Sequence, residues 1–169
     1  FEAAPVFQGS VSGYASGGNA PPLVNTIDKF SFAVDTNATD VGDLTQARNL
    51  VAGQSSTVSG YTSGGGTPTI VDTIDKFPFS SDSNATDVGN LTQVRDNVTG
   101  QSSTVSGYSS GGNSPSIVNT IEKFPFAADQ GASDVGDLTQ ARFFAAGQSS
   151  TVSGYTSGGA TPSSVNTID

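Results

Sequence analysis

Hydrophobic and polar positions recur along this chain at a fixed interval of 47 residues. Three sets of residues share the interval: Tyr14, Tyr61, Tyr108 and Tyr155; Ile27, Ile74, Ile121 and Ile168; and Arg48, Arg95 and Arg142. A fixed interval of this length indicates a tandem array of one structural unit. We therefore divide the chain, as a single repeat-built domain, into a partial first repeat at 1–43, full repeats at 44–90 and 91–137, and a partial last repeat at 138–169.

Within one repeat, the apolar pattern predicts extended segments and no helical period. We expect four strands, at 48–54, 56–63, 70–79 and around 88–92. The third of these is rich in β-branched and aromatic residues, which favour strands. Turn-forming residues separate the segments at short intervals, which is typical of an all-β fold. The sequence therefore predicts tandem four-stranded repeats, arranged as the blades of a β-propeller or, alternatively, stacked as a β-repeat fibre.

Paired glycines end the second strand of each repeat. Gly64-Gly65 and Gly111-Gly112 are separated by the same interval of 47 residues. Glycine adopts positive φ angles without steric cost, so we expect these pairs to turn the chain. Pro78 has no backbone N–H, and we expect it at a sheet edge or at a strand end.

The net charge and the absence of Cys and His argue against several classes of function. Apolar residues make up 34% of the chain and the net charge is −9, so a phosphate backbone would be repelled and nucleic-acid binding is not expected. The chain has no Cys and no His, which excludes disulfides and thiolate metal sites and removes the commonest general base. No apolar run approaches the roughly 20 residues of a membrane-spanning helix, so we expect no membrane insertion. Catalytic sites need unlike groups in unlike roles, whereas the repeats offer the same groups several times. We therefore expect neither an enzyme nor a cofactor.

The repeated arginines Arg48, Arg95 and Arg142 are interpreted as structural. A guanidinium group suits fixed oxygen acceptors, so we expect each to bond backbone carbonyls or a neighbouring blade, with a ligand contact as the alternative. Asp43, five residues before Arg48, is a candidate acidic partner; Asp137 stands in the same relation to Arg142, whereas the corresponding position before Arg95 is Asn90.

Two acidic loops resemble calcium-binding loops in the spacing of their oxygen-bearing side chains. The candidate metal ligands are Asp35, Asn37 and Asp40 in the first loop, and Asp82, Asn84 and Asp87 in the second. Carboxylate and amide oxygens suit a hard cation. No glutamate follows at the distance that a calcium loop requires, so we prefer an Asx-type turn, in which such side chains cap backbone N–H groups.

The tyrosines Tyr14, Tyr61, Tyr108 and Tyr155 are candidates for a ring of carbohydrate-stacking platforms. An aromatic ring with a polar tip suits an amphipathic ligand. The alternative, which we prefer, is that each tyrosine packs between neighbouring blades.

The order of these features resembles the kelch repeat. Leu44 and Arg48 come first, the glycine pair follows, and Ile74, Asp75 and Phe77 then precede Leu91 and Arg95. The resemblance covers nearly the whole chain and implies a four-stranded propeller blade. The chain departs from that family in having no Trp, and the strand before its glycine pair is less apolar than is usual there.

The repeats also resemble, in segments such as GYTSGG, NTIDKFPF and NATDVGDLTQAR, the repeat arrays of virion structural and fibre proteins of marine cyanophages. This resemblance implies a structural component of a virion or extracellular assembly, such as a fibre, appendage or decoration. The expected partners are further copies of the chain or neighbouring virion subunits. A host-adhesion module that binds a surface glycan is the alternative function.

Ring closure is left open by the sequence. Four full repeats would need 4 × 47 = 188 residues, and the chain has 169. Propellers close with about four to eight blades. A four-bladed ring lacking part of one blade, a ring shared between two chains, an excerpt of a longer chain and an open stack all fit this arithmetic.

Overall fold

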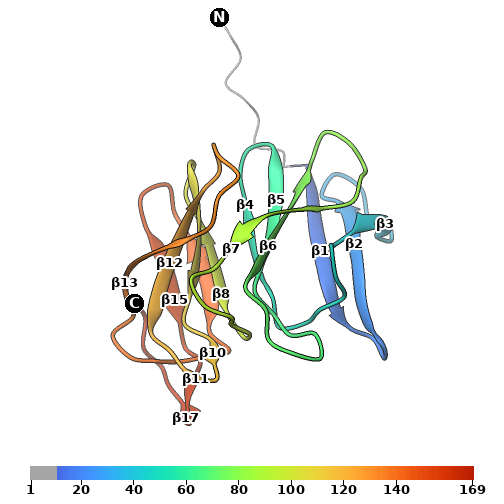
Figure 1. Cartoon of the computed structure of the whole chain (residues 1–169). Coiled ribbons are helices and arrows are strands. Elements are labelled where there is room, and N and C mark those ends of the chain that lie inside the picture. Colours follow the sequence, from blue (N-terminus) through green and yellow to red (C-terminus); the bar gives the residue numbers. More distant parts are fainter. Residues whose placement is uncertain (1–10) are drawn as a thin grey trace, which may run out of the picture.

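The computed structural model describes residues 11–169, and four of its antiparallel sheets follow the repeat (Figure 1). We call these sheets blades 1 to 4 in chain order. Residues 1–10 belong to the predicted partial repeat at 1–43 and lie outside the described residues. Strands account for all the regular structure of 11–169, which confirms the predicted all-β fold.

The strands of each blade follow one another in sequence. Blade 1 contains β1 (Ser12–Asn19), β2 (Leu23–Ser31) and β3 (Thr39–Asp43). Blade 2 contains β4 (Ala52–Ser55), β5 (Ser59–Ser63), β6 (Thr73–Pro78) and β7 (Thr86–Asn90). Blade 3 contains β8 (Thr99–Ser102), β9 (Ser106–Ser110), β12 (Thr120–Pro125) and β13 (Ser133–Asp137). Blade 4 contains β14 (Ala146–Ser149) and β15 (Gly154–Ser157). Short hairpins β10–β11 (Asn113–Ser114, Ser116–Ile117) and β16–β17 (Ala160–Thr161, Ser163–Ser164) precede the third-strand positions of blades 3 and 4.

Blades 2 and 3 have the same strand order and the same register. The order is β4-β5-β6-β7 in one and β8-β9-β12-β13 in the other. Gly60 lies opposite Phe77, and Gly107 lies opposite Phe124. Each third strand is interrupted by a bulge at the equivalent place, after Ile74 and after Ile121 in turn. The predicted unit of four strands is therefore confirmed in both full repeats.

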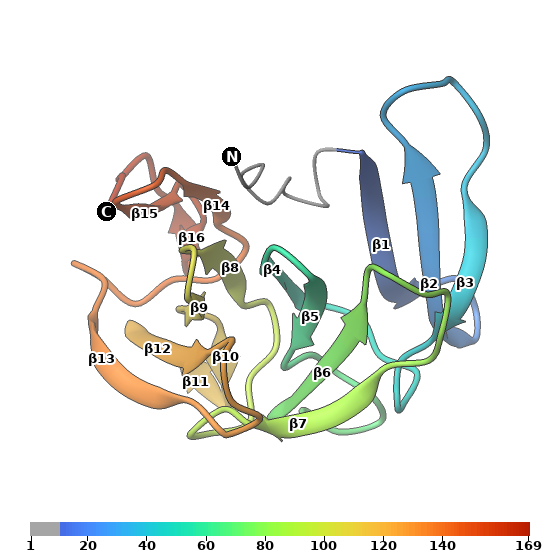
Figure 2. The same ribbon diagram turned by 90° about the horizontal axis from the view of Figure 1, so that it is seen from above.

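The blades fan out around a common centre (Figure 2). The first strands β4, β8 and β14 lie near the middle, whereas β3, β7 and β13 lie at the rim. Glycines bring the inner strands close together: a Cβ atom on Gly100 would collide with the carbonyl oxygen of Gly53, and one on Gly147 with that of Gly100. The arrangement is therefore propeller-like, with backbones in contact near the axis.

The hydrophobic core lies between blades rather than within one. Between blades 2 and 3, Phe124 is buried in a cluster with Tyr61, Ile74 and Leu91. An equivalent cluster between blades 1 and 2 contains Phe77, Phe79, Ile27, Leu44 and Ala85. A blade therefore buries its apolar side chains only when another blade lies against it, as in other repeat architectures.

The glycine pairs adopt the predicted turn conformation. Gly64 and Gly65 have φ angles of 63° and 105°, and Gly111 and Gly112 have φ angles of 60° and 99°. Pro78 is the last residue of β6, as expected of a residue without a backbone N–H. Within residues 11–169, no helix is long and apolar enough to cross a membrane.

Candidate functional site

The repeated arginines form buried ion pairs with acidic residues of the third strands. Nη2 of Arg48 lies 3.1 Å from Oδ2 of Asp75, and Nη2 of Arg95 lies 2.8 Å from Oε1 of Glu122. All four side chains have an exposed fraction of 0%. Arg48 also donates to the carbonyl oxygen of Thr62 at 3.0 Å. Each arginine therefore joins the segment that enters its blade to the second and third strands of that blade.

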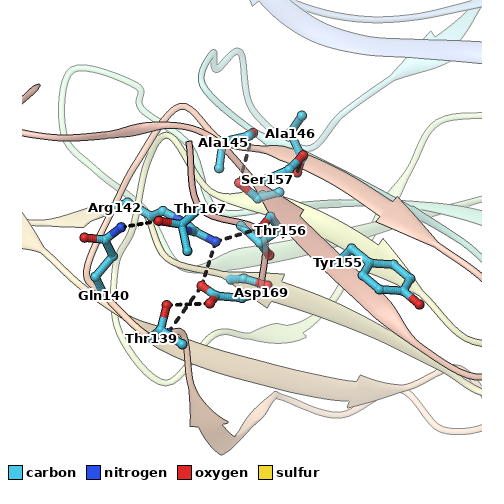
Figure 3. A network of polar contacts seen from close by, with 12 residues as sticks. Thr139, Gln140, Arg142, Ala145, Ala146, Tyr155, Thr156, Ser157, Thr167 and Asp169 are labelled. Carbon is cyan, nitrogen blue, oxygen red and sulfur yellow. Dashed lines mark hydrogen bonds and ion pairs between the residues drawn. The ribbon is translucent and has the colours of Figure 1, made fainter. Parts of the chain in front are cut away.

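Blade 4 repeats this arrangement with Arg142 and Asp169 (Figure 3). Nη2 of Arg142 lies 2.6 Å from Oδ2 of Asp169 and donates to the carbonyl oxygen of Thr156 at 2.7 Å. Thr139 donates its backbone N–H and its hydroxyl to the same carboxylate. Figure 3 shows Tyr155 pointing away from this network.

The backbone of each arginine binds the preceding blade. The carbonyl oxygen of Arg95 accepts a hydrogen bond from the N–H of Gly65 at 2.7 Å, and that of Arg142 accepts one from Gly112 at 2.9 Å. A Cβ atom on Gly64 would lie 2.5 Å from the Arg95 oxygen, so only glycine fits there. The arginines and the glycine pairs thus form one joint between successive blades.

The candidate pair of Arg48 and Asp43 is not formed. Asp43 lies in β3, in the preceding blade, where its backbone binds residues of the second acidic loop. Asp75, 27 residues after Arg48, supplies the carboxylate instead. The sequence held a usable sign of this: the position of Asp43 is Asn90 in the next repeat, whereas the position of Asp75 is acidic in every repeat.

Burial lowers the pKa of Arg48 and Arg95, and the neighbouring carboxylates of Asp75 and Glu122 oppose that effect. Both guanidinium groups remain charged at neutral pH, because the ordinary pKa of arginine lies far above it. Nε and Nη1 of Arg48 have no hydrogen-bond partner among the described residues. The pairs are nevertheless structural contacts, because all four side chains are fully buried and no ligand can reach them from the surface of the described residues.

The structure places the tyrosines of blades 1 and 2 between blades. Tyr61 has an exposed fraction of 4% and stacks on Phe126, with ring centroids 4.8 Å apart. Tyr14 stacks on Phe79 at the same distance. Burial raises the pKa of both phenols.

The predicted carbohydrate platform of four tyrosines is not assembled. Tyr61 is buried, Tyr14 and Tyr108 are half-buried, and only Tyr155 is exposed, at 42%. Because Tyr14 and Tyr61 each have one face against a phenylalanine of the next blade, those faces cannot stack on a sugar ring.

The candidate calcium ligands serve contacts between and within blades. Asp82 forms an ion pair with Lys29 at 3.1 Å, and Oδ1 of Asn84 accepts the N–H of Asp43 at 3.1 Å. The hydrogen bond to Asp82 raises the pKa of Lys29.

The remaining candidate calcium ligands either cap turns or lie in an exposed loop. Asp40 accepts the N–H of Gly42, and Asp87 accepts that of Gly89, both at 3.1 Å, in the manner of an Asx-type turn. Asp35 and Asn37 lie in the exposed loop before β3. Across residues 11–169, no three acidic side chains gather closely enough to hold a metal ion.

A hollow of about 510 Å³ opens at one end of the inner strands, and sequence reasoning missed it. Its lining is the Ser-Ser-Thr triplet that follows each of three inner strands: Ser55, Ser56 and Thr57; Ser102, Ser103 and Thr104; Ser149, Ser150 and Thr151. The repetition of the triplet every 47 residues was the available sign. A hydroxyl needs an adjacent base to act as a nucleophile, and none of these nine residues is one. The hollow therefore has no catalytic pair of its own. Its exposed lining is mostly apolar, because serine hydroxyls such as those of Ser56 and Ser103 already bond backbone groups of their own turns.

Exposed valines surround the turns beside this hollow. Val58, Val105 and Val152 occupy equivalent positions and have exposed fractions of 63%, 64% and 90%. The surface formed by the turns after the inner strands thus combines the Ser-Ser-Thr triplets with exposed valine side chains.

No protein-family model matches the chain, and no curated protein matches its sequence.

Proposed function

We propose that the chain is a structural component of an extracellular or virion assembly, built of kelch-like β-propeller blades that join blades of neighbouring subunits. It would act as part of a fibre, an appendage or a decoration. Its role would be structural, because each sheet is stabilised by contact with the next and the assembly extends sheet by sheet. The acidic loops would keep the surface of the assembly soluble.

The observation that carries this proposal is a pair of unmatched blade faces. Phe30 and Phe32 of blade 1 have exposed fractions of 39% and 57%, whereas the equivalent Phe77 and Phe79 of blade 2 have 5% and 7%. At the other end of the array, Tyr155 is 42% exposed. In the interior, such phenylalanines pack on the tyrosine of the preceding blade. Among the described residues, the exposed phenylalanines and the exposed tyrosine are thus of the same types, at equivalent positions, as those that pack together between interior blades.

An interface made of two different surfaces continues from subunit to subunit, and it produces a ring or a filament. The net charge of −9 opposes close approach of copies, so we expect assembly to strengthen as salt is added.

The test is the mass of the chain in solution by sedimentation velocity over a range of protein and salt concentrations. We expect multiples of 17.0 kDa for the native chain and a monomer for the double variant Phe30→Ser/Phe32→Ser. Val94→Ser, which also removes an exposed apolar side chain, is the control and should assemble like the native chain. A native chain that stays monomeric throughout, or a double variant that assembles normally, would refute the proposal.

A glycan-binding adhesion module is the second candidate, and the hollow lined by the three Ser-Ser-Thr triplets is the observation that favours it. The threonine hydroxyls of the triplets would donate hydrogen bonds to a sugar and accept them from it. A glycan array separates the two functions: saturable binding that is lost in a Thr57→Val/Thr104→Val/Thr151→Val variant supports adhesion, and its absence leaves the structural function.

A further inference from the structure

One position before each inner strand carries a side chain in the left-handed backbone region. Leu50, Asn97 and Phe144 occupy this position in three successive repeats, with φ angles of 56°, 53° and 55°. Such angles cost free energy in residues that have a Cβ atom, and most of all in bulky residues such as leucine and phenylalanine. At every other positive φ angle among the described residues the chain uses glycine. A side chain is therefore kept at this position although the backbone there favours glycine.

Packing in the core does not account for these side chains. Leu50 and Phe144 have exposed fractions of 41% and 65%, and Asn97 is half-buried. Leu50 lies in the interior of the array, because its carbonyl oxygen accepts the N–H of Asn97 of blade 3 at 2.9 Å, and Arg48 donates its N–H to Val24 of blade 1. The three side chains are aliphatic, amide and aromatic, so no common contact within the fold requires them.

The repeats differ from one another around this position and are identical beside it. Residues 53–61, 100–108 and 147–155 all read GQSSTVSGY, whereas the four residues before them read NLVA, DNVT and FFAA in turn. The first residue of each variable segment exchanges two backbone hydrogen bonds with a second variable position: Asn49 with Gly66, and Asp96 with Asn113. A constant scaffold thus displays side chains that change from blade to blade, which is typical of a recognition surface.

We call these places the variable tips, defined as residues 49, 50 and 66 of blade 2, residues 96, 97 and 113 of blade 3, and residues 143, 144 and 160 of blade 4. They precede the inner strands, whereas the Ser-Ser-Thr triplets follow them, so the tips lie at the opposite end of these strands from the hollow. The hairpin β10–β11, which begins at Asn113, lies at the lower end of the molecule in Figure 1. Tips of neighbouring blades lie side by side, as the hydrogen bond between Asn97 and Leu50 shows.

The variable tips combine apolar rings with polar groups. The rings of Phe143 and Phe144 have centroids 4.8 Å apart and are tilted by 55°. Nδ2 of Asn97 donates to Oδ1 of Asp96 at 2.9 Å, which orients the carboxylate. A sugar has an apolar C–H face and a polar edge of hydroxyl groups, so an oligosaccharide matches apolar and polar side chains on neighbouring tips. Asp96 and the net charge of −9 disfavour sulfated and sialylated sugars.

We propose that the variable tips bind a neutral oligosaccharide that spans neighbouring blades. Leu50 and Phe144 contact the C–H faces of its sugars, and Asp96, held in place by Asn97, accepts hydrogen bonds from their hydroxyl groups. This inference goes beyond the structural function, and its site is separate from the hollow that favours an adhesion module.

The test is a glycan array, followed by isothermal titration calorimetry with the neutral oligosaccharide that binds most strongly. The protein is the intact chain carrying Phe30→Ser/Phe32→Ser, so that self-assembly does not multiply the binding sites. We expect saturable binding, and binding at least about tenfold weaker when Leu50→Gly/Asn97→Gly/Phe144→Gly is added. The control is Thr57→Val/Thr104→Val/Thr151→Val, which changes the hollow instead and should bind normally.

The glycine variant separates recognition from a role in folding. Glycine adopts the positive φ angle without steric cost, so the urea midpoint of the variant should not fall below that of its parent. The proposal is overturned by the absence of saturable binding to any neutral oligosaccharide, by unchanged binding of the glycine variant, by a lowered urea midpoint of that variant, or by loss of binding in the threonine variant. A native chain that does not self-assemble but shows the expected binding would remove the structural function and leave the site.

Discussion

Removal of one charge from the buried pair of blade 3 should destabilise the chain strongly. Arg95 and Glu122 both have exposed fractions of 0%, and their charged atoms lie 2.8 Å apart. Nη1 of Arg95 also donates to the carbonyl oxygens of Gly111 and Thr120, each at 3.0 Å. In Arg95→Met, the carboxylate of Glu122 stays buried with only Thr92 as its partner.

An uncompensated buried charge of this kind costs about 3–5 kcal/mol. Because that cost comes from the orphaned carboxylate, Arg95→Met/Glu122→Leu should recover most of it and unfold within about 2 kcal/mol of the native chain. The contrast is Lys76→Met, which breaks the partly exposed pair with Asp129 at 2.8 Å and should cost at most about 1 kcal/mol.

The assay is urea unfolding followed by far-ultraviolet circular dichroism, with hydrogen–deuterium exchange to show which blade opens. Exchange is needed because arrays of repeats unfold in more than one step when neighbouring units are weakly coupled. A loss below about 1 kcal/mol for Arg95→Met, or a double variant as unstable as the single one, would show that the pair does not hold blade 3 together.

Two further predictions concern the aromatic contact between blades. Gly60→Ala should lower the free energy of unfolding by about 1–3 kcal/mol, since its Cβ would collide with the ring of Phe77, whereas Gly53→Ala, with nothing within 4 Å, should change it by less than about 0.5 kcal/mol; equal effects in urea unfolding would contradict this. Burial raises the pKa of the Tyr61 phenol in the folded chain above its unfolded value of about 10. The neutral phenol therefore contributes fully to the free energy of unfolding below about pH 10, and this contribution is lost as the pH rises through the pKa of the folded chain. The urea midpoint should therefore fall above about pH 10, and Tyr61→Phe should reduce that fall; an unchanged pH profile in the variant would count against the burial of the hydroxyl.

The sequence predicted the strands of the full repeats well, because their chemistry is local. The third strand was expected at 70–79 and is Thr73–Pro78, and Gly64-Gly65 adopts the expected positive φ angles. The first strand was expected from Arg48, but the ladder begins at Ala52. Arg48 and Asn49 bond outside that ladder, to Val24 of blade 1 and to Gly66, so they connect segments instead of extending the strand.

The contacts between distant parts of the chain were harder to foresee. The partner of Arg48 is 27 residues away, and the register of three strands decides which acid reaches it. The clusters between blades likewise join residues of different repeats, such as Tyr61 and Phe124, so no local pattern of residues predicts them.

Because each blade contacts only its neighbours, an array of such blades can gain or lose whole repeats during evolution. Among the described residues, side-chain hydrogen bonds between blades join positions 41 to 55 residues apart, as between Asp43 and Asn84 or between Gln54 and Ser109. Excision of residues 61–107, a segment of 47, would place Tyr108 directly after Gly60, where Tyr61 now stands. Every joint would then find an equivalent partner on the next blade. Unequal recombination between near-identical coding repeats can therefore lengthen or shorten the array by whole blades without new interfaces having to evolve.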